Sequence, residues 1–198
     1  MQFEPFRDGI EVNGTTVHAV LDGLGPYGSL ASKYLLHLGI GVRTPEGRVV
    51  IERDAWYPQS AWLKSFSLIA EDIGEAMLEQ IGARIPDNAV FPPTAPDLDG
   101  GIRSIDVAYH MNHRVDGQVM YDPATGGMLE GIGSYGYQRD SGERRIVSVC
   151  RNPYPCSFDL GLIGAVARRF EASAQVTHDP TRPCRRRGAE SCTYLITW

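Results

Sequence analysis

The sequence predicts a single α/β (α+β) domain in which helices pack on a mixed or antiparallel sheet. Two observations indicate this fold class. The 198 residues are 42% hydrophobic and 22% charged, an ordinary composition for one globular core. Segments with helical spacing of apolar residues also occur in the same chain as short alternating segments typical of strands. We expect a helical N-terminal part over 1–95 and a sheet-rich, zinc-binding part over 100–198.

The first half of the chain is expected to be mainly helical. Asn13-Gly14 lies between two β-prone runs, which is a hairpin signal. Trp62, Phe66 and Ile69 begin a long apolar stripe with helical spacing. The expected elements are a hairpin over 10–17, a turn over 23–28, helices over 29–38 and 62–82, a strand over 48–52 and a proline-framed crossing loop over 85–96.

The second half is expected to be richer in strands. Ile105, Val107, Tyr109 and Met111 alternate with more polar residues, as in a half-buried strand. Ser157 precedes an apolar helical pattern and is a natural N-cap. The expected elements are a strand over 105–111, a turn over 121–127, strands over 132–138 and 144–150, a helix over 157–170, and closing strands over 174–178 and 192–198.

Charge and hydropathy restrict the possible partners and the compartment. The net charge of −5 gives no general attraction to nucleic acid, although the run Arg185-Arg186-Arg187 could meet an anion or simply form a solvated turn. No apolar run approaches the roughly 20 residues of a membrane span, and the N-terminus lacks the pattern of a signal peptide. We therefore expect a cytoplasmic protein with no membrane and no nucleic-acid partner.

Four cysteines provide the strongest functional signal. Cys150, Cys156, Cys184 and Cys192 all lie in the last 49 residues, and each falls at the end of an expected element. In a reducing compartment such a cluster is typical of metal ligands, and zinc favours four sulfur or nitrogen ligands in a tetrahedron. The alternatives are four buried free thiols or a thiol enzyme or redox switch, in which Cys156 would be activated at a helix N-terminus.

A family resemblance strengthens the zinc prediction. The segment from Cys184 to Tyr194 resembles the C-terminal signature of the 4-vinyl reductase domain family, in which Cys-x7-Cys encloses a glycine turn and an aromatic residue follows. Cys156, 28 residues before Cys184, occupies the place of the third cysteine of that family. The resemblance covers mainly 140–198. It implies an α/β ligand-binding fold, related to trafficking-complex (TRAPP-like) folds, commonly homodimeric and used as a sensory module with bound zinc.

The fourth zinc ligand is left open by this comparison. Phenol-sensing members of the family carry a glutamate three residues before the first cysteine of the pair, where this chain has Thr181. We expect Cys150 to take that role, because closed structural zinc sites favour thiolates. His178 and Asp179 are the alternates.

Aromatic and histidine residues form the candidate ligand pocket, because ligand cavities are largely apolar with a few polar groups. On a strand His110 and His113 would point to opposite faces, whereas on a helix they would lie together. Each aromatic or histidine side chain could simply pack in the core, which is the simpler interpretation, or it could take part in binding a ligand or haem. The candidates are Trp56, Trp62, Phe66, Tyr109, His110, His113 and Tyr135.

Three functions are compatible with these features. The first is a homodimeric sensor-like module with structural zinc that receives a small apolar or aromatic molecule. The second is an enzyme or accessory factor that acts on or carries haem or another tetrapyrrole. The third is a structural interaction protein. No acid–base pair can be named among Asp106, Asp122 and Glu130, so catalysis is the less favoured reading.

Overall fold

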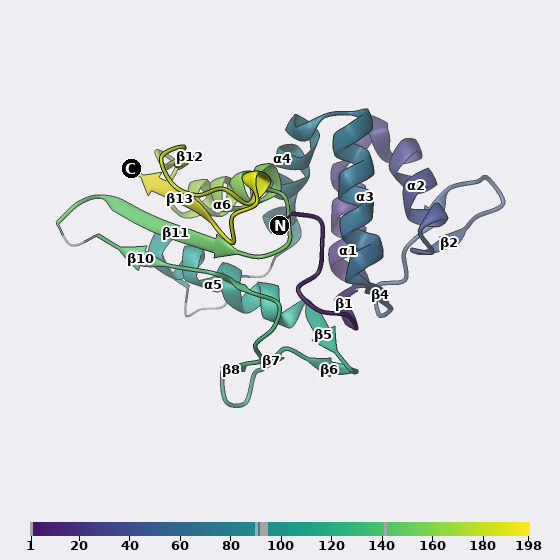
Figure 1. Cartoon of the computed structure of the whole chain (residues 1–198), viewed down its shortest axis with the longest axis horizontal. Coiled ribbons are helices and arrows are strands. Elements are labelled where there is room, and N and C mark those ends of the chain that lie inside the picture. The colour runs from purple at the N-terminus through teal and green to yellow at the C-terminus, as the bar shows by residue number, and fades with distance from the viewer. Residues whose placement is uncertain (1, 90, 92–94, 141) are drawn as a thin grey trace.

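The chain folds into a mixed α+β structure with a helical group on one side and a sheet on the other (Figure 1). The computed structural model describes residues 2–89, 91, 95–140 and 142–198. The helices are α1 (Gly14–Gly23), α2 (Gly28–His37), α3 (Gln59–Asp72), α4 (Glu75–Arg84), α5 (Leu98–Met111) and α6 (Cys156–Phe170), with short 3-10 turns at Gly25–Tyr27, Ile85–Asn88 and Arg185–Arg187.

Two antiparallel sheets organise the strands. The first has the order β4-β1-β5-β6, and the second has the order β10-β11-β13-β12 with β9 pairing on β11. Two small hairpins, β2-β3 and β7-β8, complete the set. The strands are β1 (Ile10–Asn13), β2 (Val42–Arg43), β3 (Val49–Val50), β4 (Trp56–Pro58), β5 (His113–Val115), β6 (Gln118–Val119), β7 (Tyr121–Asp122), β8 (Gly127–Met128), β9 (Ser134–Tyr135), β10 (Gln138–Arg139), β11 (Arg145–Arg151), β12 (Gln175–His178) and β13 (Cys192–Thr197).

Helix α6 joins the two halves because it packs on both the second sheet and α4. The two helices approach closely at glycines. A Cβ atom added to Gly161 would lie 1.9 Å from the carbonyl oxygen of Glu79, and one added to Gly82 would lie 2.1 Å from that of Phe158. Side-chain atoms cannot occupy that space, so the backbones touch directly. This contact fixes α6 against the helical group.

The expected hairpin at Asn13-Gly14 is wrong. Asn13 ends β1 and caps α1, because its side-chain oxygen accepts a hydrogen bond from the backbone N–H of Thr16 at 2.9 Å. Asparagine serves both turns and N-caps, and the sequence does not distinguish the two uses. A Cβ on Gly14 would also lie 1.9 Å from the Glu52 carbonyl oxygen, so glycine is required there for packing.

The long helix expected over 62–82 is two helices. Its apolar stripe continues from α3 into α4, but Gly74 between them has a φ of 101°, which an α-helix does not contain. The stripe therefore predicted the buried face correctly and missed the break. The helix expected over 157–170 is present and begins one residue earlier. Pro155, not Ser157, occupies the N-cap position.

The strand expected over 105–111 is wrong, because this segment is the second half of α5. Leu98, Ile102, Ile105 and Tyr109 share its buried face at helical spacing, and the Asp97 side chain caps the helix by accepting from Gly100 N at 2.9 Å. Alternation of apolar residues is the strand pattern, but on the helix Val107 and Met111 lie on a more exposed side than Ile105 and Tyr109. The Gly100-Gly101 pair disfavours a helix by propensity, yet Gly101 packs directly on Phe170, so tertiary contact overrides propensity.

The remaining expected elements are close to their observed places, including α2, β3, the strands around 134–151 and the two closing strands. The turn expected at 121–127 is the tip of the β7-β8 hairpin. Part of the crossing loop, residues 90 and 92–94, lies outside the described residues, as does Ser141 between the strands expected over 132–138 and 144–150. Within the described part of the chain, no helix is long and apolar enough to cross a membrane.

The close contact of α4 and α6 generates a stability prediction. Replacing Gly161 by Ala should lower the free energy of unfolding by about 1–3 kcal/mol, because the added methyl group forces the helices apart. Urea denaturation followed by circular dichroism measures the change. Gly164→Ala is the matched control on the same helix, because its added methyl would meet only the flexible Arg168 side chain. If Gly161→Ala and Gly164→Ala lower the free energy of unfolding by the same amount, this role for Gly161 is contradicted.

Candidate functional site

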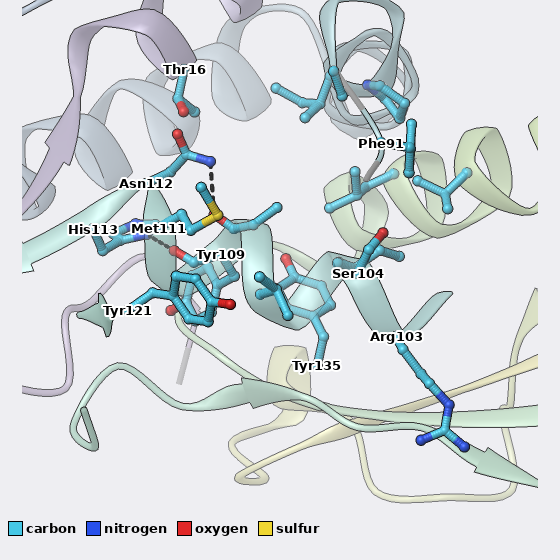
Figure 2. Close-up of a pocket in the computed structure, with 18 of the residues that line it drawn as sticks. Thr16, Phe91, Arg103, Ser104, Tyr109, Met111, Asn112, His113, Tyr121 and Tyr135 are labelled. Atoms are coloured by element: carbon cyan, nitrogen blue, oxygen red, sulfur yellow. Dashed lines mark hydrogen bonds between the residues drawn. The ribbon is translucent and has the colours of Figure 1, made fainter. Parts of the chain in front are cut away.

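A cavity of about 650 Å³ lies beside α5 and extends between α6 and the helical group (Figure 2). Its wall is mainly apolar and aromatic, with a few polar groups, which is the usual character of a small-molecule site. Phe91 faces the cavity from across α5, and Arg103 points away from it towards the sheet. The lining residues are Thr16, Trp62, Ile85, Pro86, Ala89, Phe91, Ala95, Gly100, Arg103, Ser104, Ile105, Val107, Ala108, Tyr109, Met111, Asn112, His113, Tyr121, Tyr135, Tyr154, Phe158, Leu162 and Val166.

The inner wall carries several hydrogen-bonded polar groups, while the buried Nε1 atom of Trp62 has no partner among the described residues. The Tyr109 hydroxyl donates to the Ile132 carbonyl at 2.5 Å. His113 donates from Nδ1 to the Tyr109 carbonyl at 2.7 Å, so its Nε2 accepts from the Tyr154 hydroxyl at 2.9 Å. Burial lowers the pKa of His113 to about 4, so the ring is neutral at pH 7. This end of the cavity therefore carries no charge on its histidine.

Four of the seven residues expected to bind a ligand line this cavity: Trp62, Tyr109, His113 and Tyr135. The other three lie elsewhere. Trp56 lies on β4 with the Arg114 guanidinium 4.7 Å from its ring centre. Phe66 is fully buried and packs edge-on against Trp62 with ring centres 4.7 Å apart. His110 is buried and donates from Nδ1 to the Asp106 carbonyl at 2.8 Å.

Several lining residues were not identified from the sequence. Tyr154, Phe158 and Leu162 lie on α6 or just before it, and Phe91 lies in the crossing loop. Phe158 was detectable, because it shares the apolar face of the 157–170 helix with Leu162 and Val166, whereas Tyr154, whose ring stacks on Phe158 at 5.3 Å, precedes the helix. Phe91 carried no such signal, because it lies outside any regular element.

The second site is a cluster of Cys156, His178, Cys184 and Cys192, whose ligand atoms all lie within 4.8 Å of one another. The sulfur of Cys156 lies 3.0 Å from that of Cys192 and 3.6 Å from that of Cys184, and Cys192 and Cys184 are separated by 3.8 Å. Ligands about 2.3 Å from a tetrahedral zinc ion lie roughly 3.8 Å apart. The His178 Nε2 atom is buried and has no hydrogen-bond partner among the described residues. The donor set therefore fits zinc.

The fourth position of this cluster is held by His178, one of the two alternates. Cys150 lies outside it, with its sulfur 3.5 Å from the Ser148 hydroxyl, and burial raises the pKa of its thiol well above the usual value. Asp179 accepts from the backbone N–H and the hydroxyl of Thr181 at 2.9 and 2.6 Å, so its carboxylate closes a turn. His178 reaches the cluster because β12 pairs with β13 and places it opposite Tyr194.

The charge state of the cluster favours metal binding. The pKa of Cys192 is lowered to about 3, mainly by a hydrogen bond from the Cys156 thiol and to a smaller extent by contacts from Arg185. Cys192 is therefore a thiolate, which is the form that binds zinc. The Gln2 side-chain amide also donates to the Cys156 sulfur at 2.6 Å and covers it from the N-terminal side.

A buried ion pair lies beside the cluster. The guanidinium of Arg185 contacts the Asp159 carboxylate and the side-chain and backbone oxygens of Asn152, and both charged side chains are fully buried. Burial opposes the charge on Arg185, but the Asp159 carboxylate raises its pKa, so it stays protonated. The expected solvated run therefore holds one buried arginine, while Arg186 and Arg187 are exposed.

Comparison with known proteins relates the fold to that of solved H-NOX proteins. No protein-family model matches the chain, and no curated protein matches its sequence. Solved structures do match. An H-NOX protein from S. oneidensis in the Fe(II)NO ligation state has a TM-score of 0.61 at 15% identity, over 93% of this chain and 97% of that chain. An unliganded Fe(II) H-NOX protein from K. algicida has a TM-score of 0.57 at 15% identity, over 93% of this chain and 95% of the other.

A third similar structure comes from a study of haem distortion in the H-NOX family, with a TM-score of 0.63 at 15% identity over 94% of each chain. The chain therefore has the α+β fold of the H-NOX proteins. Identity this low establishes the fold alone. The resemblance to 4-vinyl reductase domains gains no support from these matches.

The cavity residues fit haem in part. The volume and the apolar wall suit a large flat molecule. His113 is the one histidine among the described residues that line the cavity, and both of its ring nitrogens are already hydrogen-bonded. As arranged, the described residues of the wall therefore present no free imidazole nitrogen to iron.

The buried neutral His113 generates a pH prediction. Its pKa is about 4 in the folded chain against 6.5 for an unperturbed histidine, so the unfolded state binds more protons between these values. Stability should therefore fall as pH falls from 6.5 towards 4, with a contribution of up to about 1.4 kcal/mol per pH unit. Urea denaturation of the wild type and of His113→Gln at several pH values measures it. If the free energy of unfolding depends on pH between 4 and 6.5 in the variant as it does in the wild type, the burial of a neutral His113 ring is contradicted.

Proposed function

We propose that this chain is a sensory module that binds a small, mainly apolar molecule in the cavity beside α5. The cavity itself is the observation that carries the proposal, because an apolar, aromatic-lined space of about 650 Å³ with a hydrogen-bonded inner wall is built for a ligand. The fold is shared with H-NOX domains, which supports the same class of function. The Cys-x7-Cys resemblance to 4-vinyl reductase domains is consistent with a sensory role and with a homodimer.

We further propose that Cys156, His178, Cys184 and Cys192 hold a structural zinc ion. When bound, zinc would join four separate segments by closed tetrahedral coordination. The residues supply what the ion needs, namely a thiolate at Cys192, two further sulfurs and an unpartnered imidazole nitrogen. The buried positions of the three cysteines suit a structural site rather than a reactive thiol.

Haem is the second candidate for the cavity. It is favoured by the structural similarity to H-NOX proteins and by the size of the space. For His113 to bind iron, the Tyr154 hydroxyl would first have to release its Nε2 atom. Visible absorbance of the purified protein separates the candidates, because a bound haem gives an intense Soret band and a colourless apolar ligand gives none.

Metal analysis tests the zinc proposal. Purified protein should contain about one zinc ion per chain, and Cys184→Ser should reduce the zinc content and the melting temperature, because metal binding contributes to folding. Cys150→Ser is the matched control, since its sulfur lies outside the cluster, and it should retain the zinc. A variant pattern in which Cys150→Ser loses the metal and Cys184→Ser keeps it would overturn the ligand set.

Binding of a neutral fluorescent probe tests the cavity. N-phenyl-1-naphthylamine should bind with enhanced emission, and Ala108→Trp should weaken binding at least tenfold, because Ala108 lines the cavity from the exposed side of α5. Fluorescence titration measures both affinities. Ala172→Trp places the same bulk at an exposed site away from the cavity and should bind like the wild type. Equal affinity of all three proteins would show that the probe binds elsewhere.

A further inference from the structure

We propose that Arg185, Asp159 and Tyr135 couple the zinc cluster to the ligand cavity, so that occupancy of one site changes the affinity of the other. This inference rests on the proposed function and adds the regulation of its cavity. The three residues form one continuous chain of polar contacts through the interior. One end of the chain is a cysteine of the cluster, and the other end is a wall of the cavity.

The contacts begin at the cluster. The backbone N–H and the Nε atom of Arg185 both donate to the Cys192 sulfur, at 3.3 and 3.5 Å. Arg185 also directly follows Cys184, a second member of the cluster. A metal ion bound by these two cysteines would therefore fix both the backbone and the side-chain direction of Arg185. The exposed fraction of Arg185 is only 1%, so water cannot replace these contacts.

The middle of the chain is the buried ion pair. The Arg185 guanidinium contacts the Asp159 carboxylate, and Asn152 holds the same carboxylate through its Nδ2 atom at 3.1 Å. Moving either charge away from the other would leave an uncompensated buried ion, which is costly. The two side chains must therefore move together, and a shift of Arg185 is transmitted to Asp159.

The chain ends at the cavity. The Tyr135 hydroxyl donates to the other oxygen of Asp159 at 2.6 Å, and the ring of Tyr135 lines the cavity. Figure 2 shows this ring on the sheet side of the cavity, below α5. A metal-bound cluster would thus hold the Tyr135 side of the cavity in one position. A preorganised cavity wall lowers the conformational free-energy cost of ligand binding. We expect zinc and ligand to strengthen each other's binding.

Tyr109 provides a matched comparison. It is as buried as Tyr135, lines the same cavity and packs against Tyr135 with ring centres 5.3 Å apart. Its hydroxyl, however, donates to the Ile132 carbonyl and not to the ion pair. Removing the Tyr109 hydroxyl therefore changes the wall of the same cavity and leaves the chain of contacts from Arg185 to Tyr135 intact.

The test measures zinc release from the metal-loaded protein into a chromophoric chelator, with and without saturating N-phenyl-1-naphthylamine. In the wild type and in Tyr109→Phe, the probe should slow release about fivefold or more, a typical size for coupled sites. In Tyr135→Phe the probe should still bind, but the ratio of the zinc-release rates without and with the probe should fall towards one. Because the metal-loaded protein is the starting state, the test does not need the metal-free chain to stay folded.

The outcomes separate the coupling from the proposed function. If the probe binds the wild type but leaves zinc release unchanged, the coupling is overturned and the ligand-binding function stands. If Tyr135→Phe and Tyr109→Phe retain the same effect, the coupling passes through general stabilisation of the fold, and the proposed route is overturned. If the wild type binds no probe, the function and the coupling fail together.

Discussion

The buried pair of Arg185 and Asp159 is the interaction on which the rest of the site depends. It joins the loop between the two cluster cysteines Cys184 and Cys192 to α6, and through Asn152 it also holds the segment that follows β11. Two charges in a dry interior are stable only if every partner is present. The sheet, α6 and the loop must therefore be assembled together, which places the cluster and the cavity wall in a fixed relation.

Helix α6 carries both sites because of how it is packed. Its first residue, Cys156, belongs to the cluster, while Phe158, Leu162 and Val166 line the cavity. The direct backbone contact with α4 at Gly82 and Gly161 sets the depth of the helix in the structure. A small displacement of α6 would thus change the cavity and the cluster at the same time, and the fold makes these two sites parts of one unit.

The sequence predicted those features that depend on local pattern. The apolar stripe from Trp62 gave the buried face of α3 and α4, and the last two strands were placed correctly. Asn13-Gly14 and the 105–111 segment were assigned wrongly. An Asn-Gly pair serves both hairpin turns and helix starts, and the alternation over 105–111 masked the helical spacing of Leu98, Ile102, Ile105 and Tyr109.

From the sequence, Cys156, Cys184 and Cys192 are suited to act together on two grounds, the metal-binding chemistry of clustered thiols and the resemblance to the Cys-x7-Cys signature. Tertiary structure alone decided that His178 and not Cys150 completes the cluster. The pairing register of β12 with β13 places His178 opposite Tyr194 and within the cluster, whereas Cys150 on β11, opposite Cys192, has its sulfur beside Ser148. Register is set by which face of a strand is buried and by the connections between strands, so the spacing of the cysteines alone did not specify it.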